Sequence, residues 1–256
     1  MADGLTFWDH LDELKHSLVR IVIASLLFAI VAFLFKDELF GIILGPQRSD
    51  FVTYRLLGIA APLSSNDGLT VSLINTGLAQ QFMIHMRVSF WVGLLCASPY
   101  IIFTLFRFVW PALYTKERRN SVRSVAFGFG MFLLGVALCY FLIFPITFRF
   151  LATYTVSDSV PNMITLDSYI STLLTMSVIM GVVFELPVLC LLLARLGVLS
   201  SDFMKHYRRH AILIIVLVAA IITPTGDPFT LLTVSVPIYL LYELSILMVR
   251  RVELKR

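Results

Sequence analysis

The stretch SVAFGFGMFLLGVALCYFLIFPITF, residues 124–148, is an apolar run without a single charged side chain. A helix needs about 20 apolar residues to cross a hydrocarbon core of about 30 Å, so this run predicts a transmembrane helix. The whole chain agrees, because 59% of its 256 residues are hydrophobic and 14% are charged, against about 45–50% and about 25% in soluble domains. This composition excludes a soluble enzyme and a disordered chain, and it predicts an all-α integral membrane protein.

Five further apolar segments flank this run. Three of them are long enough to cross a bilayer. The other two hold only 13 and 14 residues, which as helices cover about 20 Å each. We therefore expect six transmembrane helices, the last two short, in a single membrane domain over residues 1–256, and no strand or internal repeat is evident. The five segments are Leu18–Phe35, Leu78–Phe106, Ser168–Ala194, Ala211–Thr223 and Phe229–Tyr242.

Basic residues concentrate in alternate connections. The first loop, 107–123, carries five Lys or Arg against one acid, and the second, 195–210, carries four against one. The intervening connections 149–167 and 223–229 hold more acids than bases. Because loops rich in Lys and Arg stay on the cytoplasmic side, both termini are predicted to be cytoplasmic.

Two segments outside the spans carry their own structure signals. Residues 1–17 predict a cytoplasmic amphipathic segment, with Leu11, Leu14 and Leu18 on one helix face. The stretch 36–77, with Gly and Pro turn signals, is too long for a simple turn and predicts a structured periplasmic cap.

The chain lacks the short motifs of known enzymes. It has no His-Glu-x-x-His, Gly-x-Ser-x-Gly or glycine-rich phosphate loop. The three cysteines lie inside apolar runs and the five histidines share no metal-ligand spacing. We therefore expect no enzyme activity, cofactor or metal, and no nucleic-acid partner, because the net charge of +4 is spread over separate loops.

Each of two cytoplasmic carboxylates has both a structural and a functional interpretation. Glu13 is either the polar face of an interfacial helix or a ligand-binding group. Glu117, the only acid of the first loop, either pairs with Lys116 or Arg118 or binds a cationic ligand. A carboxylate matches the planar guanidinium of arginine with two hydrogen bonds, so the pair Glu13 and Glu117 suits an arginine-bearing partner.

A third carboxylate, Glu185, lies in the middle of the fourth span. An ionised side chain there costs at least about 2.5–3.5 kcal/mol, so Glu185 is protonated, paired or facing water. It either serves packing as a neutral hydrogen-bonded acid or has a functional role. Pro187, two residues later, predicts a kink.

The motifs around these acids resemble those of the TatC family, the multispanning core of the twin-arginine protein translocase. Each motif is weak alone, but the four in this order are specific, and they cover essentially the whole chain. They are His10-Leu11-Asp12-Glu13-Leu14-Lys15, Phe108-Val109-Trp110-Pro111-Ala112-Leu113-Tyr114 followed by Glu117-Arg118-Arg119, Phe184-Glu185-Leu186-Pro187, and Thr223-Pro224 followed by Asp227.

The resemblance implies a receptor that binds the twin-arginine signal peptides of folded proteins at the cytoplasmic face. It implies a concave, glove-like bundle in the bacterial inner membrane. It also implies homo-oligomers, small single-span TatA-type or TatB-type partners, and export driven by the protonmotive force. The implied signal-peptide residues are Glu13, Lys15, Phe108, Pro111, Tyr114, Glu117 and Arg118, and the implied intramembrane or partner-facing residues are Glu185, Thr223 and Asp227.

A different class of protein is the alternative. A secondary transporter or channel for a small solute would use Glu185 as a proton or cation relay. Such proteins usually show internal pseudo-symmetry and broken midplane helices, and the sequence shows no such symmetry.

Overall fold

The computed structural model of the chain describes residues 7–48, 50–58, 73–109, 121–157, 159, 162–223 and 226–254. In this part of the chain, five helical stretches are long and apolar enough to cross a membrane. They confirm the four longer spans expected from the sequence and add the last helix as a fifth. The stretches are Lys15–Leu34, Gln80–Leu105, Val125–Thr153, Leu166–Arg195 and Pro228–Glu253.

The described residues divide into two units. The first unit contains α1 (Phe7–Leu34), most of α4 (Gln80–Val109) and the start of α5 (Ser121–Leu138). The second contains the rest of α5 and every other helix and strand.

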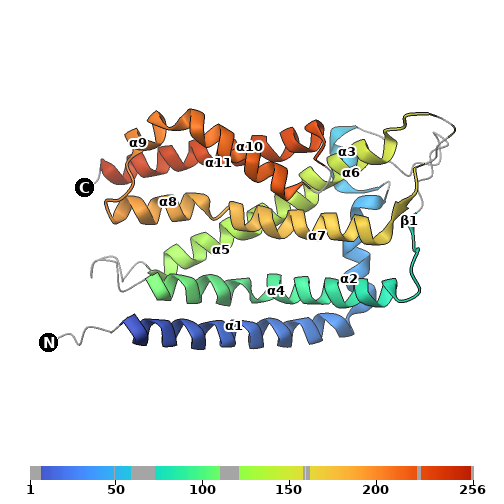
Figure 1. Ribbon diagram of the computed structural model, residues 1–256, viewed down its shortest axis with the longest axis horizontal. Helices are drawn as coiled ribbons and strands as arrows, with labels where there is room; N and C mark the ends of the chain where they lie inside the picture. The colour runs from blue at the N-terminus through green and yellow to red at the C-terminus, as the bar shows by residue number, and fades with distance from the viewer. Residues whose placement is uncertain are drawn as a thin grey trace. The chain divides into compact units, whose positions relative to one another are not determined.

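In the first unit, α1 and α4 pack through small side chains and lie side by side (Figure 1). Ser25 and Ala29 of α1 face Gly93 of α4 so closely that a Cβ on Gly93 would lie 2.6 Å from the Ala29 nitrogen and 2.7 Å from the Ser25 carbonyl oxygen. Small residues permit this close approach of two membrane helices. At the other end of the contact, the ring of Phe33 stacks on His85 with centroids 4.1 Å apart.

In the second unit, two of the three long spans are interrupted. The third span runs from α5 through a π-helical turn (Cys139–Ile143) into α6 (Phe144–Thr153). The fourth is α7 (Leu166–Val183) followed by α8 (Leu186–Arg195), with Glu185 in the break between them. Pro187 stands in the first turn of α8, where its missing N–H does no harm. The break confirms the predicted kink.

The two interrupted spans cross at a pair of glycines. A Cβ on Gly135 of α5 would lie 2.6 Å from the Met180 carbonyl oxygen and 2.8 Å from the Phe184 Cβ. A Cβ on Gly181 of α7 would lie 2.7 Å from the ring of Phe132. This crossing therefore brings α5 against the turn that precedes Glu185.

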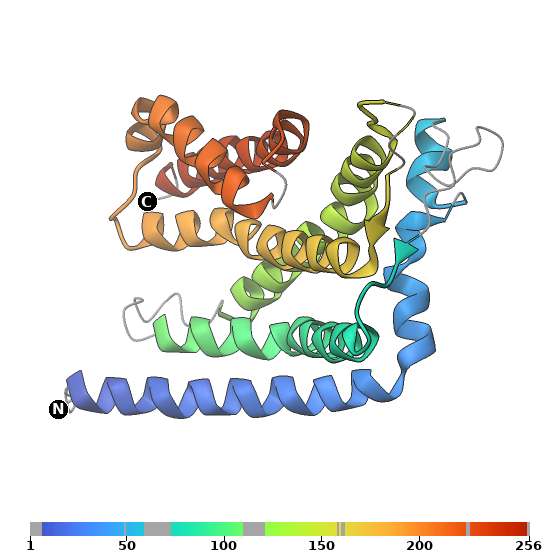
Figure 2. The same ribbon diagram turned by 45° about the vertical axis from the view of Figure 1, so that its right-hand side comes forward.

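Tyrosines tie the segment after the first span to the helices of the second unit. Tyr140 and Tyr169 donate hydrogen bonds to the carbonyls of Ile42 and Ile43, at 2.6 and 3.0 Å. These carbonyls end α2 and have no partner inside that helix. The segment comprises α2 (Lys36–Ile43), a 3-10 turn (Gly45–Gln47) and α3 (Val52–Leu57), and Figure 2 shows α3 beside α6.

Tyr54 of α3 completes this attachment from the buried side. Its hydroxyl donates to the carbonyls of Pro46 and Pro145, at 2.9 and 3.3 Å. Burial raises the pKa of the Tyr54 phenol, against the opposing charge of Arg149. The hydroxyl therefore keeps its proton and remains a donor.

The structure contains two short strands that were not predicted from the sequence. β1 (Leu73–Ile74) pairs in parallel with β2 (Ile164–Thr165), Leu73 opposite Ile164 and Ile74 opposite Thr165. With two residues in each strand, no alternating pattern is long enough to be recognised in the sequence.

Of the two helices expected to be short, only the first one is short in the structure. The 15-residue α10 (Arg208–Ile222) is short, as expected, but the 26-residue α11 (Pro228–Glu253) is not. The prediction of two short helices is therefore wrong for α11. The helix continues past Glu243 because residues 244–249 are again mostly apolar and bury Ile246 and Val249. The Glu243 carboxylate within it accepts hydrogen bonds from Arg208 and Tyr239. Between α8 and α10 lies the short α9 (Ser201–His206).

Candidate functional site: the end of the α1–α4 pair

The register of α1 against α4 places residue 13 and residue 108 at one end of the first unit. Ala29 faces Gly93, and Phe33 faces His85, so the two helices are antiparallel. From this contact, Glu13 lies about 24 Å along α1, and Phe108 lies about 22 Å along α4 in the same direction. Both positions are therefore level, within a turn of helix.

The described residues cover only part of the predicted signal-peptide site. The backbone of Glu13 lies in the second turn of α1 and that of Phe108 in the last turn of α4, while both side chains fall outside the described part of the chain. Lys15 is exposed on α1. Four predicted residues, Pro111, Tyr114, Glu117 and Arg118, lie outside the described residues.

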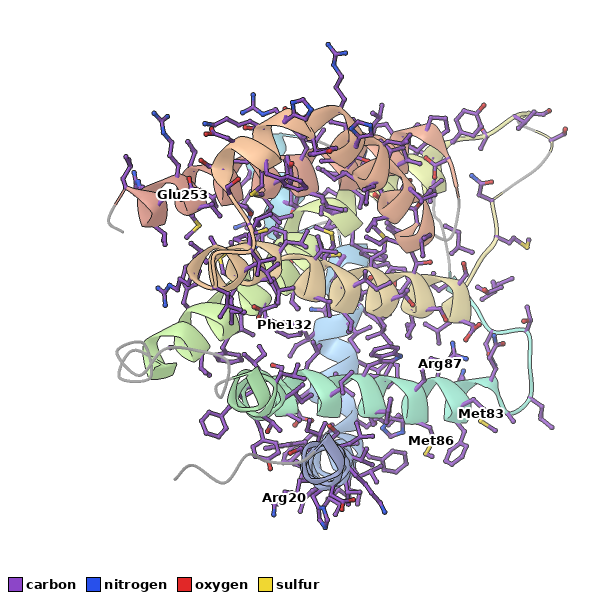
Figure 3. All side chains as sticks on the ribbon, turned by 60° about the vertical axis from the view of Figure 1, so that its left-hand side comes forward. Arg20, Met83, Met86, Arg87, Phe132 and Glu253 are labelled. Carbon is purple, nitrogen blue, oxygen red and sulfur yellow. The ribbon has the colours of Figure 1, made fainter. Side chains whose placement is uncertain are left out.

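The connection that carries Glu117 nevertheless has both of its helical ends described. It leaves α4 after Val109 and enters α5 at Ser121. Val109 is one residue beyond Phe108, so this connection starts at the level of Glu13. Arg20, by contrast, lies on the side of α1 away from α4 (Figure 3), and it is not part of the same surface.

Glu185 stands in the break between α7 and α8 with an unusual environment. Its Oε1 atom is buried, and within the described part of the chain it has no hydrogen-bond partner. The residue as a whole is half-buried. A buried oxygen left without a partner costs about 1–3 kcal/mol. The arrangement can therefore accept a hydrogen bond from a partner, or donate one when the acid is protonated.

The two residues predicted near the last turn have local structural roles. Thr223 is buried, and its hydroxyl donates to the Ala219 carbonyl at 3.0 Å. Asp227 caps α11, where its carboxylate accepts the Thr230 N–H at 2.7 Å. These bonds lie at the end of α10 and at the start of α11, and a contact with partner subunits stays a prediction.

A second set of carboxylates, not predicted from the sequence, joins α9 and α10 to α11. Glu243 accepts from Arg208 at 2.8 Å and from Tyr239 at 3.1 Å. Glu253, on the last turn of α11 (Figure 3), accepts the Ser201 N–H at 2.9 Å. The sequence did contain one signal of the Arg208–Glu243 pair. Arg208 lies just before the apolar run of α10 and Glu243 just after that of α11, so a hairpin of the two helices would bring them to the same level.

Comparisons with known proteins agree with this architecture. The family described as TatC, Sec-independent protein translocase protein, matches residues 9–237. The Sec-independent protein translocase protein TatC of a Blattabacterium species is 33% identical, with 94% of each chain covered. That of Desulforapulum autotrophicum is 34% identical, over 94% of this chain and 83% of its own.

Solved structures lead to the same family. A crystal structure of the twin arginine translocase receptor TatC superposes with a TM-score of 0.77 at 30% identity, covering 94% of this chain and 98% of its own. Together with the five described helical stretches that are long and apolar enough to cross a membrane, these matches show a multi-pass membrane protein. The chain belongs to the TatC family of Sec-independent protein translocase proteins.

Proposed function

We propose that this chain is the receptor subunit of a twin-arginine translocase and binds the signal peptides of folded cargo at the end of the α1–α4 pair. Glu13 and Glu117 would each bind one guanidinium group of the arginine pair. Phe108, Pro111 and Tyr114 would form the surrounding surface, next to Lys15 and Arg118. The observation that carries this proposal is the register that brings residues 13 and 108 to one level.

The charge of the connection between α4 and α5 supports a cytoplasmic location for the end of the α1–α4 pair, because residues 107–123 carry five Lys or Arg against one acid. In the second unit, Ala194 at the end of α8 packs in one buried cluster with Val249 near the end of α11. Arg208 at the start of α10 and Ser201 of α9 bind Glu243 and Glu253 of α11. Basic residues predominate at all three helix ends. By the preference of Lys and Arg for the cytoplasmic side, this end faces the cytoplasm. With six membrane helices, of which α10 is the short one, both termini would then lie in the cytoplasm, and residues 36–77 would form a periplasmic cap.

Glu185 would serve a second step, the assembly of small single-span TatA-type or TatB-type subunits within the membrane. A membrane helix that offers a hydrogen-bond donor would satisfy the buried Oε1 atom. Thr223 and Asp227 would form the outer part of that contact. Assembly into larger complexes and export driven by the protonmotive force belong to the same proposal.

The test of recognition is crosslinking of a twin-arginine peptide to the full chain in membrane vesicles. Glu13→Ala combined with Glu117→Ala should weaken capture by at least about tenfold per carboxylate, since a hydrogen bond to a charged group contributes about 1.5–3 kcal/mol. Asp12→Ala is the matched control, because it removes an exposed carboxylate next to Glu13. A twin-lysine peptide should be captured weakly by the unmodified chain. Unchanged capture by the double variant would refute the site.

A topology experiment tests the same proposal independently. In a background without the three cysteines, single cysteines at positions 13 and 117 should react with an impermeant thiol reagent from the cytoplasmic side. A cysteine at position 55, in α3, should react from the other side. Labelling of positions 13 and 117 from opposite sides would exclude a shared site.

The alternative of a small-solute transporter is not favoured. The relatives are named as protein translocase proteins, and the matching crystal structure is that of a translocase receptor.

A further inference from the structure

Exposed positions at the junction of α9 and α10 combine aromatic and basic side chains. We name His206, Tyr207, Arg209 and His210 the 206–210 corner, and all four are exposed. Tyr207 is its centre, with ring centroids 5.1 Å from His206 and 5.5 Å from His210. Phe203 adds a fourth ring, 4.6 Å from that of Tyr207. Polar-tipped aromatic rings of this kind favour the boundary between lipid tails and water.

The neighbouring ion pair fixes the depth of the corner in the membrane. Arg208 binds Glu243 at 2.8 Å. Arg208 and Arg209 are the last charges before the apolar run of α10, and Glu243 is the first charge after the apolar run of α11. Two helices thus place their apolar boundary at one level, and the 206–210 corner lies there.

The corner is positively charged because the nearest acids are paired with cations. Asp202 pairs with Lys205 at 3.0 Å and Glu243 with Arg208 at 2.8 Å. Glu253, which accepts from Ser201, keeps its charge but stands on the same turn of α11 as Arg250 and Arg251. In the described part of the chain, by contrast, four arginines at this end have no ion-pair partner: Arg195, Arg209, Arg250 and Arg251. Of these four, Arg209 alone belongs to the corner.

An apolar surface continues directly from Arg209 along α10. Arg209, Leu213 and Leu217 follow one another at intervals of four and therefore share one helix face. Leu213 is 71% exposed and Leu217 is 61% exposed. A cation at the boundary and an apolar strip that extends into the membrane match the two parts of a phospholipid, the phosphate headgroup and the acyl chains. A soluble polyanion would leave the strip unused.

We infer that the 206–210 corner is a binding site for one anionic phospholipid. Arg209 pairs with the headgroup phosphate, Tyr207 and the two histidines enclose it, and an acyl chain lies along Leu213 and Leu217. Guanidinium and phosphate form two parallel charge-assisted hydrogen bonds, which makes Arg209 the principal contact. The inference rests on the proposed placement of α10 in the membrane and not on signal-peptide recognition.

Native mass spectrometry of the full chain, released from detergent with added phosphatidylglycerol or phosphatidylcholine, tests the inference. The unmodified chain should retain phosphatidylglycerol in preference to phosphatidylcholine. Arg209→Gln should lower this preference by about fivefold, the usual effect of one basic residue at an anionic membrane surface. Arg209→Lys, which keeps the charge but not the planar fork, should fall between the two. If Arg209→Gln also lowers the unfolding midpoint, the variant has a folding defect, and the intermediate preference of Arg209→Lys then decides.

Arg251→Gln is the matched control. It removes one exposed arginine from the same end of the molecule, about 12 Å further along α11 than Glu243, which exceeds the screening length of about 8 Å at physiological salt. It should change the preference less than twofold. Equal losses for both variants would show general attraction rather than a site, and would overturn the inference.

Two further measurements distinguish a lipid site from a free-anion site and from the receptor site. Millimolar inorganic phosphate should not displace the retained lipid, and displacement would indicate a site for free anions instead. Capture of a twin-arginine peptide by Arg209→Gln should stay at the unmodified level. A loss of peptide capture with unchanged lipid retention would assign Arg209 to the receptor site and refute the lipid site.

Discussion

Gly93→Ala is the most informative single change in the first unit. It adds one methyl group at the point where α4 lies closest to α1. The new carbon would meet the nitrogen and Cα of Ala29 at 2.6 and 2.7 Å and the carbonyl oxygen of Ser25 at 2.7 Å. All three are backbone atoms, so no side chain can rotate out of the way. The helices themselves must separate.

The size of the effect follows from the missing distance. Ordinary contact begins at 3.4 Å, so α1 must move by close to 1 Å, and overpacking of this kind costs about 1–3 kcal/mol. Alanine also favours a helix over glycine by about 1 kcal/mol, which opposes the loss. Gly130→Ala isolates that gain, because a Cβ on Gly130 of α5 has nothing within 4 Å. Gly93→Ala should therefore be less stable than Gly130→Ala by about 1–3 kcal/mol.

The measurement is the free energy of unfolding of both variants in lipid bicelles, followed by crosslinking of a twin-arginine peptide. Because the contact around Gly93 sets the level of Glu13 against Phe108, Gly93→Ala should also lower peptide capture, and Gly130→Ala should not. If Gly93→Ala proves as stable as Gly130→Ala, the close packing of α1 on α4 is refuted. The shared level of Glu13 and Phe108 would then lose its support.

Three other changes test separate features. Glu185→Gln should preserve export and Glu185→Lys should abolish it, because a neutral hydrogen-bonding group suffices while an unpaired cation in mid-span costs about 2.5–3.5 kcal/mol; loss of export with Gln would point to proton exchange instead. Asp227→Ala removes the cap on the Thr230 N–H and should lower the unfolding free energy by about 0.5–2 kcal/mol, and no change would show that the cap is dispensable. Tyr169→Phe leaves the buried Ile43 carbonyl without its hydrogen-bond donor. It should lower the free energy of unfolding by about 1–3 kcal/mol and speed proteolysis after α2, and an unchanged rate of cleavage there would contradict this role of Tyr169.

Features that depend on neighbours in the chain could be predicted from the sequence. The long apolar runs predicted four of the five long spans, and Pro187 predicted the break beside Glu185. Each follows from local chemistry, either the length of an apolar run or the missing N–H of proline.

Features that depend on distant partners could not be predicted. The predicted last span ends at Tyr242, ahead of the charged Glu243. In the structure, Arg208, 35 positions away, pairs with that charge, and α11 extends to Glu253. The tyrosine bonds to the end of α2 join residues about 100 positions apart, as Tyr140 and Ile42 do. The candidate site lies between these cases. The small residues Ser89, Gly93 and Ala97 at intervals of four indicate a packing face, but only the structure shows that α1 lies on it.

The carboxylates of the second unit differ in how their oxygens are paired. Glu243 and Glu253 stand on membrane-length helices too, and each has partners that match its oxygens: Arg208 and Tyr239 for the first, Ser201 for the second. The same fold thus supplies donors where a carboxylate only has to be accommodated. Glu185 Oε1 is buried without a donor in the described part of the chain, at a cost of about 1–3 kcal/mol. In the proposed assembly step, the carboxyl of the half-buried Glu185 would turn toward a partner helix that supplies a donor, and binding would then recover that free energy.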